Sequence, residues 1–275
     1  MRAHNLQRSF CALSAGGFLA LCSTANAGAA SLDEILKRNE LVVCAHADSL
    51  PYSSQRGTPD GFQIDLGRAL ATELGVALRV QFMRLHREPR RKECDALISV
   101  AVPKNPDADI DYLVSDAYMA YRPVIVVPQA RPPIRAFEDL ADGPVAVLSG
   151  SWAHFLLTQR DMPVWVRYRT EDEIVGAVEN DGVTAGIVSQ FSLGWYLKNH
   201  PHARVRESTG IVLDEDLGFD VAVGLMEADR GLLDRVNASL ANMHAKGIIA
   251  ATLERYGIAL ELPTRVRHEA KRQAD

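Results

Sequence analysis

The chain has 275 residues, of which 47% are hydrophobic and 24% are charged, and its formal net charge is −5 at pH 7. This length is ample for a core built as one large domain or as two lobes. Nucleic acids and anionic membranes are both negatively charged, so an acidic chain is a poor partner for either. We therefore exclude a nucleic-acid-binding or membrane-surface function.

The first 27 residues are organised like a secretory signal peptide. Arg2 and Arg8 supply the positive charge, residues 10–21 form an apolar run, and Ala25 and Ala27 frame a small-residue cleavage site. A helix that spans a membrane needs roughly 20 apolar residues, which is longer than this run. We therefore expect cleavage near Ala27 and a soluble periplasmic product.

Beyond the signal, strand and helix patterns alternate. A capping box of Ser31 and Glu34 predicts a short first helix, and a second helix is expected over residues 64–74, ended by Gly75. Strands are expected at residues 41–45, 78–82, 96–100 and 121–127.

After a linker at residues 129–133, the alternation begins again. The expected strands are residues 145–148, 164–168, 185–188 and 219–225. One helix is expected to begin at Trp152. Three further helices are expected over residues 171–180, 189–199 and 230–246, followed by a last helix that ends at Tyr256. The residues after Pro263 are rich in charge, so we expect a disordered tail over residues 263–275. The chain thus divides into two similar α/β halves.

A polar loop follows the first predicted strand. It holds Asp48, Tyr52 and Ser53, and residues 61–66 then open the next helix. A strand that delivers a polar, aromatic-bearing loop to the start of a helix is typical of the rim of a small-molecule site.

Signal cleavage would leave two cysteines, Cys44 and Cys94. In an oxidising compartment, such a pair can form one disulfide that closes a loop of about 50 residues. Cys44 lies late in its strand, however, and Cys94 immediately precedes another strand, so adjacent parallel strands would offset the two. The sequence leaves open whether they pair.

The order of elements resembles the family 3 periplasmic solute-binding proteins, the two-lobed receptors best known from amino-acid ABC importers. The similarity covers residues 41–256, and its motifs are Pro51-Tyr52-Ser53, residues 61–66, Ser115-Asp116-Ala117-Tyr118, Phe137-Glu138-Asp139-Leu140, Ser149-Gly150-Ser151 and Tyr256-Gly257. The resemblance implies a type II α/β binding-protein fold, in which each lobe is a mainly parallel sheet flanked by helices and the ligand binds in the cleft.

The same resemblance implies the domain limits. Residues 28–120 and 218–262 would form lobe 1, residues 121–217 would form lobe 2, and Tyr118, Tyr121 and Gly218 would lie at the hinge.

Two departures from the family pattern concern the ligand. Members that bind amino acids hold the α-carboxylate with an Arg and a Thr after the strand equivalent to residues 96–100, but residues 101–107 contain no Arg here. They hold the α-ammonium with an Asp, and Ser189 takes that place. A zwitterion without counter-charges would leave buried charge uncompensated. We therefore expect a small polar or anionic ligand other than an ordinary α-amino acid.

A subgroup of the family is also similar, namely proteins encoded with periplasmic PQQ-dependent methanol or alcohol dehydrogenases. The shared features are Cys44-Ala45, Leu50-Pro51-Tyr52-Ser53, Cys94-Asp95 and a C-terminal pattern at residues 219–224. This resemblance implies a role accessory to the dehydrogenase instead of import.

The candidate ligand contacts are Asp48, Tyr52, Ser53, Ser149, Gly150, Ser151, Ser189 and Gln190. The three residues Ser149, Gly150 and Ser151 precede a helix, so their N–H groups and hydroxyls suit an anion, although a plain helix cap explains them equally well. Ser189 and Gln190 likewise begin a helix that faces the cleft.

No histidine spacing indicates a metal site, and no nucleophile or phosphate-loop motif is present. We therefore expect no catalytic residues, metal or cofactor. Three functions remain: a receptor that docks on an ABC permease, an accessory factor of a PQQ-dependent dehydrogenase, and an enzyme resembling cyclohexadienyl dehydratase. The last needs a general acid in the cleft, and the sequence singles out no carboxylate for it.

Overall fold

The computed structural model describes residues 31–83, 94–103, 109–180, 182–211, 213 and 217–264. The predicted signal peptide and most of the predicted tail lie outside the described residues, as do residues 84–93 and 104–108.

The helices and strands follow one another in an α/β order. They are α1 (Leu32–Arg38), β1 (Glu40–His46), β2 (Asp48–Ser49), β3 (Ser53–Ser54), α2 (Phe62–Leu74), β4 (Ala77–Met83), β5 (Ala96–Ala101), β6 (Tyr112–Val114), β7 (Met119–Tyr121), β8 (Pro123–Pro128), η2 (Phe137–Leu140), β9 (Val145–Ala146), α3 (Trp152–Gln159), β10 (Val164–Trp165), α4 (Glu171–Asn180), β11 (Ala185–Ser189), α5 (Gln190–Asn199), β12 (Val205–Ser208), β13 (Phe219–Met226), α7 (Arg230–Ala245) and α8 (Ile248–Glu254).

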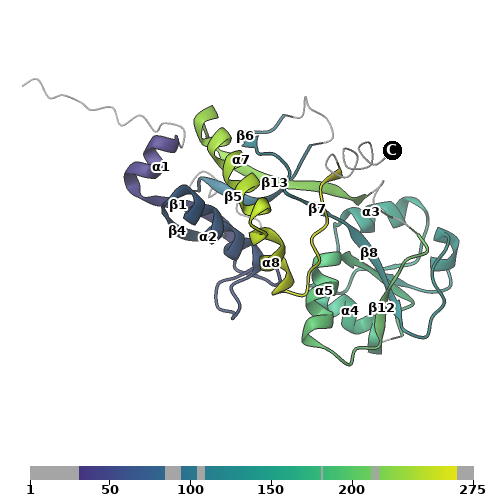
Figure 1. Cartoon of the computed structure of the whole chain (residues 1–275). Helices are drawn as coiled ribbons and strands as arrows, with labels where there is room; N and C mark the ends of the chain where they lie inside the picture. Colours follow the sequence, from purple (N-terminus) through teal and green to yellow (C-terminus); the bar gives the residue numbers. More distant parts are fainter. Residues whose placement is uncertain are drawn as a thin grey trace, which may run out of the picture.

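Two sheets form two lobes, so the predicted two-lobed α/β fold is confirmed (Figure 1). The first sheet has the order β4-β1-β5-β13-β6, with β7 also paired to β13, and the second has the order β10-β9-β11-β8-β12. Each lobe has a mainly parallel sheet, as predicted, with one reversed strand. These strands are β13 in the first sheet and β8 in the second, which follow the crossings between sheets and run antiparallel to each of their neighbours.

The chain changes sheets between Tyr121 and Pro123, and again between β12 and β13. The prediction of one strand over residues 121–127 was wrong at its start. Tyr121 ends β7, which pairs with β13 in the first sheet, and β8 begins at Pro123 in the second sheet. The apolar pattern runs through both strands, so it does not reveal that the chain passes from one sheet to the other.

The helix signals read from the sequence are confirmed. Ser31 and Glu34 form the predicted capping box at the start of α1, and Gly75 ends α2 in the left-handed conformation that favours glycine. The remaining predicted helices and strands are found with small changes in length. Four short strands, β2, β3, β6 and β12, were not predicted, and β7 overlaps a predicted strand only at Tyr121.

Successive side chains of β8 point to opposite faces of the second sheet, so its apolar residues join two different clusters. Val124 and Val126 pack with the cluster that contains Ile174 of α4. Ile125 and Val127 point to the other face and pack with the cluster of α3 and η2. Helices therefore cover both faces.

The first lobe packs α1, α2, α7 and α8 around its sheet (Figure 1). Its core also contains Phe191, a buried residue of α5, which belongs to the second lobe. One aromatic side chain of the second lobe thus completes the core of the first.

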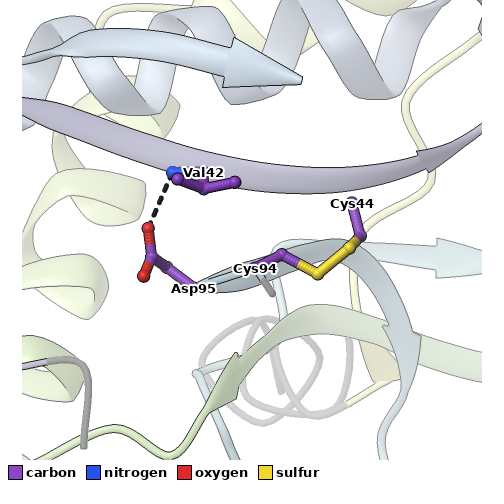
Figure 2. Close-up of a disulfide and its surroundings, with 4 residues drawn as sticks. All are labelled: Val42, Cys44, Cys94 and Asp95. Atoms are coloured by element: carbon purple, nitrogen blue, oxygen red, sulfur yellow. Dashed lines mark hydrogen bonds between the residues drawn. A yellow bond between two sulfur atoms is a disulfide. The ribbon is translucent and has the colours of Figure 1, made fainter. Parts of the chain in front are cut away.

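Cys44 and Cys94 form a disulfide beside β1 (Figure 2). The register places Leu97, and not Cys94, opposite Cys44, so the predicted offset is present between the two strands. The chain bends at Asp95, and this bend brings Cys94 close to Cys44. The Cα atoms of the two cysteines lie 5.6 Å apart.

The same bend is held by hydrogen bonds to Val42. The backbone N–H of Val42 donates to the Asp95 carboxylate at 2.7 Å (Figure 2). The backbone N–H of Asp95 donates in turn to the Val42 carbonyl at 2.9 Å. Arg38 forms an ion pair with the same carboxylate. The buried Asp95 is thereby compensated in charge and hydrogen bonding.

Candidate functional site

The loop that carries Tyr52 is fastened to the start of α2. The backbone N–H groups of Phe62 and Gln63 donate to the carbonyls of Pro51 and Tyr52 at 2.9 and 3.0 Å. These bonds use donors that a helix N-terminus would otherwise leave without partners. The loop and the helix therefore form one rigid unit that fixes the position of Tyr52.

Gly61 makes this junction possible. Its φ is +106°, and a Cβ atom there would lie 2.4 Å from the carbonyl oxygen of Tyr52. Its N–H donates to the hydroxyl of Tyr256 at 3.0 Å. The chain thus needs a residue without a side chain at this position.

We expect Gly61→Ala to lower the free energy of unfolding by roughly 1–3 kcal/mol or more, because it adds a backbone clash to an unfavourable φ. Gly75→Ala is the matched control, since Gly75 also has a positive φ but a Cβ there would meet nothing within 4 Å. Urea unfolding of both variants measures the difference. Equal losses would show that the close approach at Gly61 has no energetic consequence.

The side chain of Tyr52 reaches from the first lobe to the second. Its hydroxyl donates to Oγ of Ser189 at 2.8 Å. Its ring lies 5.3 Å from the ring of Phe62 and 5.9 Å from that of Phe191. Tyr52 therefore joins the lobes through both a hydrogen bond and aromatic packing.

Ser189 ends β11 and caps α5, accepting a hydrogen bond from the backbone N–H of Ser192. Glu171, the first residue of α4, accepts from both the N–H of Ser189 at 3.1 Å and its hydroxyl at 2.6 Å. The resemblance placed an Asp of the family pattern at Ser189. A carboxylate is thus present beside that position, but another helix supplies it.

The carboxylate of Glu171 influences two tyrosines. Burial, and secondly the negative charge of Glu171, raise the pKa of the Tyr121 hydroxyl. Burial followed by the same charge also raises the pKa of Tyr52 well above its ordinary value. Both hydroxyls therefore stay protonated and act as neutral groups at physiological pH.

A cavity of about 240 Å³ lies next to Glu171. Strands and helices of both lobes contribute to its lining, which consists of Tyr121, Pro123, Leu148, Ser151, Trp152, Ala153, Glu171, Ile187, Val188, Leu217 and Phe219. The rings of Tyr121 and Phe219 stack at 4.4 Å with an interplanar angle of 8°. The lining is thus mainly apolar and aromatic, with a single carboxylate.

Among the predicted contacts, Ser151 lines this cavity, while Ser189 and Tyr52 connect to it through Glu171. Ser151 also caps α3 by accepting from the N–H of His154. The N–H of Gly150 donates to Nδ1 of His154, so part of the predicted anion-binding turn is already used. Ser149 and Gly150 are exposed and do not line the cavity.

Two other predicted contacts belong to the β2–β3 hairpin, away from the cavity lining. Asp48 is exposed and pairs with Ser54 across the hairpin. Ser53 is buried, and its hydroxyl donates to the carbonyl of His46. Their positions give them a structural role in the loop that carries Tyr52.

Gln190 lies at the crossing between sheets, not in the cavity lining. Its side-chain amide donates to the Ala120 carbonyl at 2.9 Å and accepts from the Arg122 N–H at 2.8 Å. Both ends of the amide are therefore bonded to the backbone of the crossing strand. The structure places Gln190 as a clamp on this crossing.

The predicted hinge residues lie in different surroundings. Tyr121 and Gly218 line a small pocket at the crossing. Tyr118 is buried in the core of the first lobe, where its hydroxyl donates to the Ile98 carbonyl at 2.7 Å. Tyr118 thus packs in the lobe, while Tyr121 contributes to both the crossing and the cavity.

Sequence reasoning missed Glu171, Trp152 and Phe219 as residues of the site. An acidic residue at the start of a helix is common because it interacts favourably with the helix dipole, so Glu171 carried no distinct signal. Phe219 opens an apolar strand and Trp152 opens a helix. Only folding brings these residues to one cavity.

In the part of the chain that the structure describes, no helix is long and apolar enough to cross a membrane. The same residues contain no group of three or more His, Cys, Asp or Glu side chains that could hold a metal ion.

The family model for bacterial extracellular solute-binding proteins, family 3, matches residues 41–259. The chain belongs to this family. Its curated relatives include the arginine-binding extracellular protein ArtP of Bacillus subtilis (strain 168), which is 24% identical over 242 residues, covering 83% of this chain and 88% of ArtP.

Solved structures of the same fold include a solute-binding protein and MxaJ. The ancestral cationic amino acid solute-binding protein AncCDT-1 has a TM-score of 0.68 and 24% identity over 82% of this chain and 98% of its own. MxaJ from Methlophaga aminisulfidivorans MPT has a TM-score of 0.63 and 18% identity over 80% of this chain and 99% of its own. These similarities confirm the two-lobed type II fold.

Proposed function

We propose that this family 3 protein is a periplasmic, non-enzymatic solute receptor whose lobes close on one small molecule beside Glu171. The observation that carries the proposal is the position of the cavity. Tyr121 and Phe219 belong to strands of the first sheet, whereas Glu171 and Trp152 belong to helices of the second lobe. A ligand between them would contact both lobes and so favour the closed arrangement.

In this proposal, residues 28–120 and 218–262 form one lobe, residues 121–217 form the other, and the signal peptide directs export. A closed receptor would then present its ligand to an ABC permease. ArtP is named as an arginine-binding protein and AncCDT-1 as a cationic amino acid solute-binding protein. An ordinary α-amino acid remains a poor candidate here, because its carboxylate would meet Glu171 without a cationic partner among the described lining residues.

The exposed Trp152 provides a test of this function. Trp152 lines the cavity yet is 73% exposed, whereas Phe155 of the same helix is 56% exposed and lies outside the lining. Thermal unfolding should be measured with panels of amino acids, organic acids, alcohols, amines and PQQ. A ligand at about 100 times its Kd adds about 2.7 kcal/mol of stability.

We expect one compound class to raise the Tm of the wild-type protein and of Phe155→Ala by several degrees. Trp152→Ala should retain its own stability but lose most of the shift. If no compound in any class raises the Tm, the solute-receptor function is wrong.

A second candidate is an accessory role with a periplasmic PQQ-dependent dehydrogenase. The observation that favours it is the aromatic pair of Trp152 and Phe155, two exposed rings 6.3 Å apart on α3. Exposed aromatic pairs are common in surfaces that bind proteins. This candidate gains support if Trp152→Ala and Phe155→Ala both weaken binding to a purified dehydrogenase.

A further inference from the structure

The charge of the cavity restricts the ligands it can hold. Glu171 supplies a carboxylate, and none of the described residues that line the cavity is Lys, Arg or His. An anionic ligand would place a second negative charge near Glu171 in a partly dehydrated space, at a high electrostatic cost. The sequence-based expectation of an anionic ligand therefore finds no support in this lining.

The carboxylate of Glu171 is oriented by hydrogen bonds, and no described residue neutralises its charge. Its two oxygens accept from the N–H and the hydroxyl of Ser189. A carboxylate has about four lone-pair sites, so acceptor capacity remains for a ligand. Among the described residues, no Lys, Arg or His nitrogen forms an ion pair with Glu171. A bound cation would supply the missing counter-charge.

Aromatic rings complete this environment. Trp152, Tyr121 and Phe219 all line the cavity that contains Glu171. The faces of aromatic rings attract organic cations, and tryptophan does so most strongly. Rings combined with a carboxylate are suited to a positively charged group that also has an apolar body. The volume of about 240 Å³ lies below the usual range for drug-sized ligands, so the ligand is compact.

From these contacts we infer that the cavity binds a small organic cation without a carboxylate group, with Glu171 as its counter-charge and Trp152 as a covering ring. This inference rests on the proposed function and names its ligand class. A protonated amine would donate hydrogen bonds to Glu171, and a quaternary ammonium ion would contact it through charge alone.

Isothermal titration calorimetry tests the inference with defined probes. Methylammonium, tetramethylammonium and guanidinium represent the cations, acetate and succinate the anions, and glycine the zwitterions. The variant Glu171→Gln removes the charge and keeps an acceptor for Ser189. Glu173→Gln is the matched control, because Glu173 lies on the same helix and is exposed, outside the cavity lining.

We expect at least one cationic probe to bind, and Glu171→Gln to weaken that binding roughly tenfold or more, as for the loss of a charged contact. Glu173→Gln should leave it within about twofold. Trp152→Ala should also weaken it. The comparison of the three cations distinguishes amine, quaternary ammonium and amidinium-like ligands.

Two results would overturn the inference. Binding of an anion or zwitterion in preference to every cation would show that the ligand class is wrong while leaving the receptor function intact. Equal cation binding by wild type and Glu171→Gln would show that Glu171 is not the counter-charge. Failure of all these probes and of the broader compound panel would instead contradict the receptor function itself.

Discussion

Replacement of Phe191 by alanine is expected to lower the free energy of unfolding by about 3–5 kcal/mol, the range found for large aromatic residues in cores. Phe191 is 2% exposed and belongs to the core cluster of the first lobe, although its helix α5 is part of the second. Its ring lies 5.2 Å from that of Phe62 and 6.1 Å from that of Tyr121. The variant would leave a cavity where the lobes meet.

Urea unfolding followed by circular dichroism measures this loss. Phe155→Ala is the control, since Phe155 is 56% exposed and its removal should change stability by no more than about 0.5 kcal/mol. Two separate transitions for Phe191→Ala, in place of one, would also indicate that this ring couples the lobes. A loss as small as that of Phe155→Ala would contradict the shared core.

Removal of the disulfide is expected to have an effect of similar size. Cys44 and Cys94 are separated by 50 residues in the sequence, and closing a loop of this length contributes about 4 kcal/mol in the chain-entropy model. Both cysteines are 5% exposed and pack with Val42. Alanine at both positions therefore removes the cross-link with little loss of apolar contact.

Chemical unfolding of the double variant Cys44→Ala, Cys94→Ala should show this loss. Dithiothreitol should destabilise the wild-type protein to a similar extent and leave the double variant unchanged. If the oxidised wild-type protein and the double variant unfold at the same urea concentration, the disulfide does not stabilise the fold.

Most of the architecture could be predicted from the sequence because its signals are local. Gly75 and the Ser31–Glu34 capping box set helix ends that the structure confirms. The two reversed strands could not be derived in the same way. An apolar run such as β8 has the same pattern in a parallel and an antiparallel sheet, so the reversal appears only when the crossings are known.

The site was less predictable for a related reason. Tyr52 and Ser189 were named as candidates, and they meet at 2.8 Å. Glu171, which accepts hydrogen bonds from Ser189, is 18 residues before it in the sequence and resembles any acidic residue at a helix start. Gln190 shows a different limit of the sequence pattern. It was also named as a candidate contact, and its side-chain amide is hydrogen-bonded to the backbone of the crossing strand.

Fluorescence of Trp152 is the most direct measurement of the central claim, which is that the cavity beside Glu171 closes on a small organic cation. The three tryptophans of the chain are Trp152, Trp165 and Trp195, so Trp165→Phe with Trp195→Phe leaves Trp152 as the only reporter. We predict a saturable blue shift of its emission on titration with the organic cation that binds in calorimetry, because the ligand and the closing lobe cover the exposed ring. An emission maximum that no cationic probe changes, at concentrations that saturate calorimetric binding, would contradict the account.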